Sequence, residues 1–145
     1  MSTTERTLLS RNVITAPTAT RWPARLVSAV LAVAVVIVHV IDQGGIPGAK
    51  DPSYVGAGYH VLEIVGLVTA VLLLARASVP AWLLALGVGA GPLAGYVLSR
   101  GPGLPGYTDD RGNWTEPLGL ISLAVEFTLV VISLSALLRH RLKTA

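Results

Sequence analysis

The chain has no cysteine and few charged residues. Of its 145 residues, 13% are Asp, Glu, Lys or Arg, whereas 52% are hydrophobic. The absence of cysteine excludes a disulfide, a thiolate metal site and a thiol nucleophile. The scarcity of charge, together with long apolar runs, excludes an ordinary soluble domain and is typical of a membrane protein. A chain of this length forms one compact bundle.

The usual motifs of catalytic and nucleotide-binding proteins are also missing. The sequence contains no Gly-rich phosphate loop and no Ser/His/Asp arrangement in a folded catalytic domain. The segment TDDRGN lacks the spacing of an EF-hand and is interpreted as an acidic turn. Because the loops are too short to build a water-facing active site, we do not expect an enzyme. The basic run at the C-terminus is short, so we expect it to set membrane topology and not to bind nucleic acid.

Four apolar segments have the length and composition of membrane-spanning helices. They cover approximately residues 26–41, 55–75, 81–98 and 118–138. We therefore predict an all-α fold, an integral membrane four-transmembrane-helix bundle over residues 26–138. Residues 1–25 are rich in Ser, Thr and Arg and are predicted to form a flexible cytoplasmic tail, and residues 139–145 a basic cytoplasmic C-terminus.

Lys and Arg are distributed unequally between the two sides of the predicted bundle. Eight of the eleven lie in the N-terminal tail, at Arg76 or in the C-terminal segment. The other two loops hold only Lys50, Arg100 and Arg111, together with five acidic residues. Cytoplasmic loops carry the excess of Lys and Arg. We therefore predict a multi-pass protein of the cell (plasma) membrane, embedded in the lipid bilayer with both termini cytoplasmic.

Glu63 and Glu126 are the only acidic residues inside the predicted spans. A carboxylate at the centre of a membrane helix costs about 2.5–3.5 kcal/mol, so each needs a partner, a proton or a water-filled cavity. Both lie at a depth of roughly 12 Å from the outer end of their span. Tyr59 and His60 share the helical face of Glu63, and His39 lies on a small, polar face of the first span. We predict an intramembrane polar cluster of these five residues in the outer half of the bundle.

Each member of this cluster also has a purely structural interpretation, which the sequence leaves open. His39 is near the outer end of its span and could snorkel to the membrane surface. His60 and Glu63, three residues apart, could form a structural hydrogen-bonded pair. Glu126 could be a neutral packing acid that is hydrogen-bonded by Ser122.

Gly87, Gly91 and Gly95 recur every four residues in the third span. Small residues at this spacing allow another helix to approach closely in lipid, so we predict that this stripe is a helix-packing surface. Pro92 beside it removes one backbone donor and favours a bend.

The order of these features resembles that of a group of small four-helix bacterial membrane proteins. A histidine near the end of span one (His39) is followed by Gly-Tyr-x-x-Leu-Glu in residues 58–63, a Gly-rich third span, Gly-Leu-Pro-Gly in residues 103–106 and an acid in span four (Glu126). The resemblance implies the four-helix membrane fold and marks His39 and Glu126 as members of the pattern. It implies no particular reaction.

Three functions are compatible with these observations. The first is a binding or accessory subunit that contacts a partner membrane protein or forms a homo-oligomer. The second is a proton- or cation-handling transporter that uses Glu63 and Glu126. The third is a haem or metal protein in which His39 and His60 are ligands, with the two glutamates for a harder metal. The sequence identifies no cofactor, and we favour the first function because it requires the fewest assumptions.

Overall fold

The computed structural model describes residues 22–144, which contain four α-helices. These are α2 (Trp22–Asp42), α3 (Ser53–Ala75), α4 (Val79–Arg100) and α5 (Pro117–Thr144). In these residues the only β-structure is an isolated bridge between Leu104 and Tyr107. Each helix is long and apolar enough to cross a membrane. The predicted all-α, four-helix membrane architecture is therefore confirmed. Residues 1–21 of the predicted N-terminal tail lie outside the described residues.

The helices extend beyond the apolar segments that predict them. α2 begins at Trp22 and so includes the end of the predicted tail. α4 continues to Arg100, and α5 continues through the basic C-terminal segment to Thr144. Polar and aromatic side chains at the membrane surface are compatible with helix, and a further helical turn satisfies backbone groups that would otherwise lack partners. Hydropathy therefore underestimates the length of the helices.

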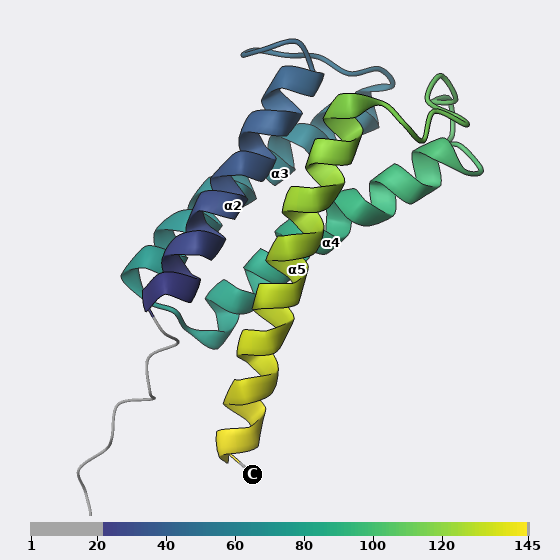
Figure 1. Cartoon of the computed structure of the whole chain (residues 1–145). Helices are drawn as coiled ribbons and strands as arrows, with labels where there is room; N and C mark the ends of the chain where they lie inside the picture. The colour runs from purple at the N-terminus through teal and green to yellow at the C-terminus, as the bar shows by residue number, and fades with distance from the viewer. Residues whose placement is uncertain (1–21, 145) are drawn as a thin grey trace, which may run out of the picture.

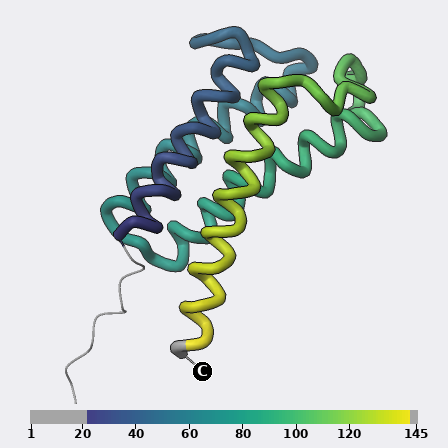
Figure 2. Tube along the Cα trace, in the orientation of Figure 1, coloured from purple at the N-terminus to yellow at the C-terminus, as the bar shows by residue number. Residues whose placement is uncertain are grey.

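The four helices run alternately up and down (Figure 1). The two long connections, residues 43–52 and 101–116, lie at one end of the bundle, which we call the loop end. The start of α2, the short turn after α3 and the end of α5 lie at the other end, and α5 extends beyond its neighbours there (Figure 2). α2 contacts all three other helices, whereas α3 and α5 make no contact with each other within the described residues. α3 and α5 therefore occupy opposite corners of the bundle.

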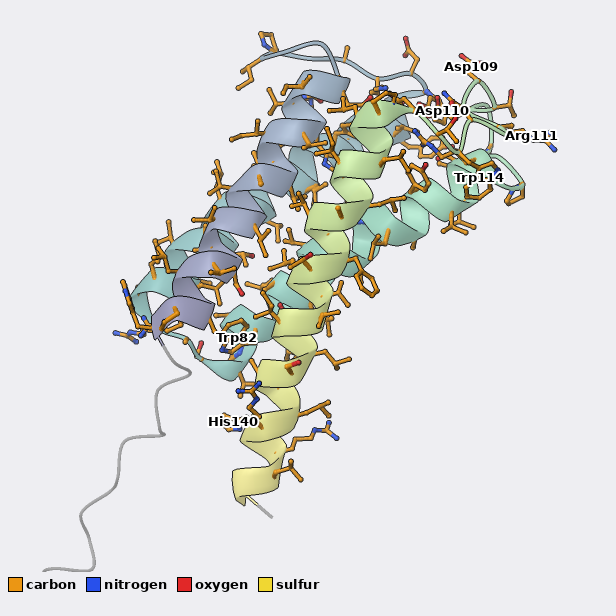
Figure 3. All side chains as sticks on the ribbon, viewed as in Figure 1. Trp82, Asp109, Asp110, Arg111, Trp114 and His140 are labelled. Carbon is orange, nitrogen blue, oxygen red and sulfur yellow. The ribbon has the colours of Figure 1, made fainter. Side chains whose placement is uncertain are left out.

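The apolar core fills the half of the bundle away from the loop end. Its largest side chain belongs to Trp82 at the start of α4, which lies near the end of the bundle opposite the loops (Figure 3). The core consists mainly of Ala29, Ala32, Val35, Leu73, Ala81, Trp82, Ala85, Val88 and Leu129. The half of the bundle nearer the loops is instead rich in buried polar side chains, and these form the candidate site described below.

A glycine outside the predicted stripe makes the close contact between α4 and α5. Gly87 and Gly91 are exposed, and a Cβ atom added at Gly87, Gly91 or Gly95 would meet no described atom within 4 Å. A Cβ atom at Gly89 would lie only 2.8 Å from the carbonyl oxygen of Glu126 in α5. Gly89 is about 200° around the helix from Gly91. Within the described chain a Cβ atom at the predicted stripe would therefore touch no other helix, whereas Gly89, like Gly66 and Gly119, lies where two helices are in close contact.

Candidate functional site

A cavity of about 130 Å³ lies at the loop end, between α2, α4, α5, the start of α3 and the loop 101–116. Along α5 it reaches from Leu118 to Glu126, a distance of roughly 12 Å. A cavity of about 150 Å³ holds a molecule the size of benzene. The polar side chains on its wall come from all four helices and the loop, and they are His39, Asp42, Tyr59, Tyr96, Ser99, Arg100, Tyr107, Asp110, Glu116, Ser122 and Glu126.

Glu126 and His39 form the base of the cavity. Glu126 is 1% exposed and accepts a hydrogen bond from the hydroxyl of Ser122. His39 is 9% exposed, and its Nδ1 lies 2.9 Å from the carbonyl oxygen of Val35. Because a carbonyl oxygen only accepts, Nδ1 carries the hydrogen, and Nε2 of the neutral ring has a free lone pair. This Nε2 lies 4.0 Å from Oε1 of Glu126. His39 is therefore directed into the bundle and does not snorkel.

Tyr59 and Asp42 form the wall where α2 and α3 approach each other. The ring of Tyr59 packs edge-to-face on His39, with 5.0 Å between ring centroids. The Tyr59 hydroxyl donates a hydrogen bond to the Asp42 carboxylate. Lys50 Nζ lies 3.0 Å from the same carboxylate. The charge of Asp42 is thus compensated from outside the cavity.

Arg100 organises the mouth of the cavity. Its side chain is 9% exposed, and its Nη2 donates to Glu116 at 2.6 Å. Nη1 lies 3.4 Å from Asp110 and donates to the Ser99 hydroxyl at 3.1 Å, while Nε donates to the Asn113 carbonyl oxygen at 3.1 Å. A buried guanidinium needs such partners, because an unpaired charge there is costly. The Arg100 side chain therefore connects the end of α4 to three residues of the loop 101–116, Asp110, Asn113 and Glu116.

Two tyrosines complete the mouth. The Tyr96 ring lies under the Arg100 guanidinium at 4.0 Å, and its hydroxyl donates to the carbonyl oxygen of Trp114 at 2.8 Å. The Tyr107 hydroxyl donates to Asp110 at 2.7 Å. Burial, and then this hydrogen bond, raise the pKa of Tyr107. Asp110 and Trp114 lie together at the loop end in Figure 3.

Glu63 and His60 lie outside this cavity. Glu63 accepts a hydrogen bond from the side-chain amide of Gln43, and its Oε2 lies 3.4 Å from Nδ1 of His60. The His60 side chain is 49% exposed. Because α3 and α5 are at opposite corners, Glu63 and Glu126 do not meet. The predicted cluster is therefore divided, with His39, Tyr59 and Glu126 at the cavity and His60 with Glu63 in a separate group.

Much of the mouth of the cavity is not predictable from hydropathy. Hydropathy places Arg100, Asp110 and Glu116 in a connection outside the spans, but Arg100 is the last residue of α4 and is buried. The available signal was a single arginine directly after a Gly-rich span, followed by a loop with three acidic residues. Such an arginine can turn inward to pair with the acids of its own loop.

The haem or metal interpretation depends on how the His and Glu side chains are grouped. Among residues 22–144, no three His, Asp or Glu side chains are close enough to hold a metal ion together. His39 lines the cavity, whereas His60 lies outside it and its side chain is 49% exposed.

The chain was compared with models of protein families, with curated proteins and with solved structures. None of these comparisons finds a match. The candidate site is therefore interpreted from its own chemistry: a cavity at the loop end with a buried His–Glu pair at its base and an arginine–carboxylate network at its mouth.

Proposed function

We propose that the protein is a small polytopic membrane protein, a binding or accessory subunit, whose cavity receives a small polar ligand. The observation that supports this proposal is the cavity of about 130 Å³ with Glu126 at its base. A carboxylate at this depth of a membrane helix costs free energy, and such groups in membrane proteins are usually functional. A bundle that needed only to fold could fill the same volume with apolar side chains, as its other half mainly does, where no ionisable side chain is among the buried residues of the described chain.

The ligand enters from the outer side of the plasma membrane in this proposal. The cavity lies at the loop end, and the positive-inside rule assigns the loops at this end to the outside. Single cysteines at the exposed Ile46 and Arg111 should react with an impermeant thiol reagent in intact cells. A cysteine at Arg76, at the other end of the bundle, should react only after the membrane is permeabilised. Labelling of Arg76→Cys in intact cells would contradict this orientation.

Ligand binding is tested by thermal unfolding of the purified protein in mild detergent. A ligand that binds only the folded state at 100 times its Kd stabilises it by about 2.7 kcal/mol. We expect at least one class in a panel of small cationic, neutral and anionic solutes to stabilise the protein saturably.

The control uses two serines of α5. Ser122→Leu places a large side chain in the cavity and should abolish the stabilisation by the ligand. Ser135→Leu makes the same exchange at a residue that is not part of the cavity wall, and should retain it. If no solute stabilises the wild type, or if both variants respond like the wild type, the cavity is not a binding site.

Proton handling is a second candidate function, favoured by the His39–Glu126 pair. His39 Nε2 and Glu126 Oε1 are 4.0 Å apart, and one group that donates hydrogen bonds to both atoms fits between them. Proton flux is measured with a pH-sensitive dye enclosed in proteoliposomes. Glu126→Gln should abolish any flux, whereas Glu63→Gln should not, because Glu63 lies outside the cavity. The absence of flux above protein-free vesicles would exclude this candidate.

A further inference from the structure

We propose that the ligand of the cavity is a small organic cation, a primary ammonium ion of about six heavy atoms or fewer, whose –NH3+ group binds between Glu126 and His39. This inference rests on the proposed binding function and specifies its ligand class. Three properties of the cavity support it: the hydrogen-bond groups left free, the balance of charge and the available volume.

No hydroxyl group on the described cavity wall is free to donate a hydrogen bond to a ligand. In the part of the chain that the structure describes, each hydroxyl on the wall donates to an acceptor of the protein itself. Tyr59 donates to Asp42, Tyr107 to Asp110 and Ser122 to Glu126. The remaining two, Tyr96 and Ser99, donate to carbonyl oxygens of the backbone. A ligand rich in acceptors, such as a carboxylate, would therefore find few partners here.

The base of the cavity instead has hydrogen-bond acceptors without a donor. Glu126 uses Oε1 for the hydrogen bond from Ser122, and among residues 22–144 no donor is bonded to its Oε2. His39 uses Nδ1 as the donor to Val35, which leaves Nε2 of the neutral ring as an acceptor. An ammonium group carries three N–H donors and no acceptor, so it matches this set of free groups. At 4.0 Å apart, Glu126 Oε1 and His39 Nε2 are too distant to bond each other directly.

The charges on the wall also favour a cation. Asp42 is paired with Lys50, whereas Asp110 and Glu116 share the single guanidinium of Arg100. Glu126 has only His39 nearby, whose ring is neutral unless it binds a second proton. The cavity therefore has more negative than positive charge. A buried carboxylate without a cation is costly, and a bound ammonium ion offsets part of this cost.

Arg100 does not provide an alternative site for an anion. Its Nε and both terminal nitrogens already donate to Asn113, Ser99 and Glu116. One face of the guanidinium is covered by the Tyr96 ring at 4.0 Å. An incoming carboxylate would find at most one N–H of Nη2 without a partner, and would lie beside the carboxylates of Glu116 and Asp110. The volume of about 130 Å³ is close to that of a cavity that holds benzene, so it suits a ligand of a few heavy atoms.

The experiment compares three solutes of nearly equal size and different charge: n-propylammonium, 1-propanol and propionate. Binding to the full-length protein in mild detergent is measured by isothermal titration calorimetry at constant pH and ionic strength. We expect n-propylammonium to bind saturably and about tenfold or more tightly than 1-propanol or propionate, because charge-assisted hydrogen bonds are roughly twice as strong as neutral ones. This comparison needs only the wild-type protein.

Two isosteric variants assign the site. Glu126→Gln should weaken n-propylammonium binding about tenfold or more. Glu63→Gln should leave n-propylammonium binding unchanged, because Glu63, the other acidic residue of the predicted spans, lies outside the cavity. Equal or tighter binding of 1-propanol or propionate would overturn the ammonium assignment and leave the binding function intact. Unchanged n-propylammonium binding in Glu126→Gln would overturn the assigned site, and failure of n-propylammonium to bind would overturn the ligand class. The serine variants above decide separately whether the cavity binds any ligand.

Discussion

Replacement of Gly89 by alanine tests how closely α4 and α5 pack. A Cβ atom at this position would lie 2.8 Å from the carbonyl oxygen of Glu126, 2.8 Å from Val130 Cγ2 and 3.3 Å from the Val130 amide nitrogen. The side chain of Val130 can rotate, but the backbone of α5 cannot move without the whole helix. Gly91→Ala is the matched control, because it changes the same helix by the same atoms and meets no described atom within 4 Å.

The expected difference follows from these contacts. Forcing an extra methyl group into a packed interface typically costs about 1–3 kcal/mol. Replacement of glycine by alanine inside a helix by itself stabilises the folded protein by about 0.5–1 kcal/mol, because alanine loses less backbone entropy on folding. Since this second contribution is present in both variants, the difference between them isolates the packing cost. We therefore expect Gly89→Ala to be less stable than Gly91→Ala by about 1–3 kcal/mol.

The free energy of unfolding is measured by denaturant titration in mild detergent, with both variants and the wild type at the same detergent concentration. Movement of α5 also displaces Glu126, so Gly89→Ala should bind the cavity ligand more weakly than Gly91→Ala. Equal stability of the two variants would refute the close α4–α5 contact. A larger loss in Gly91→Ala would instead indicate that the glycine stripe packs against another chain and contributes more than Gly89.

Three further predictions concern the polar groups. The effects of Glu63→Gln and Glu126→Gln on the free energy of unfolding should add within about 0.5 kcal/mol, because α3 and α5 do not touch. A double variant whose free energy of unfolding departs further from the sum would contradict the observed arrangement. Arg100→Gln should destabilise the protein by about 2–3 kcal/mol in the same titration, since it leaves Glu116 without its cation, and wild-type stability would mean that the network is not formed. Folding raises the pKa of Tyr107 above its unfolded value of about 10. The stability that the protonated Tyr107 hydroxyl contributes is therefore fully present below a pH of about 10 and is lost as the pH rises through the folded-state pKa. Tyr107→Phe should reduce this alkaline loss of stability, and an unchanged pH profile would contradict it.

The face that each helix turns inward was partly predictable from the sequence. In α5 the small and polar residues Gly119, Ser122, Glu126 and Ser133 recur at helical spacing, and all four are buried. Helical periodicity places these four residues on one face of α5, and polar side chains in a membrane helix face the interior of the bundle and not the lipid. The lengths of the helices were less predictable, because hydropathy is low at the membrane surface, where helices continue.

The pairing of polar groups was not predictable from depth and face alone. Glu63 and Glu126 lie at similar depth on their helices, but the order in which four helices are arranged around the bundle decides whether they meet. In the structure α2 and α4 contact each other across the centre and separate α3 from α5. Glu63 is therefore bonded to Gln43 and His60, and Glu126 faces His39 instead.

The sequence by itself determined the four membrane-spanning helices and the presence of ionisable groups within them. These properties depend on local composition, because an isolated apolar segment in lipid must satisfy its own backbone hydrogen bonds and does so as a helix. Only the tertiary structure decided which groups share the cavity, that Arg100 closes its mouth and that Gly89 is the residue of close approach. Those properties depend on contacts between residues far apart in the chain, and the free energy of each contact depends on which helices are neighbours and on their rotation about their axes.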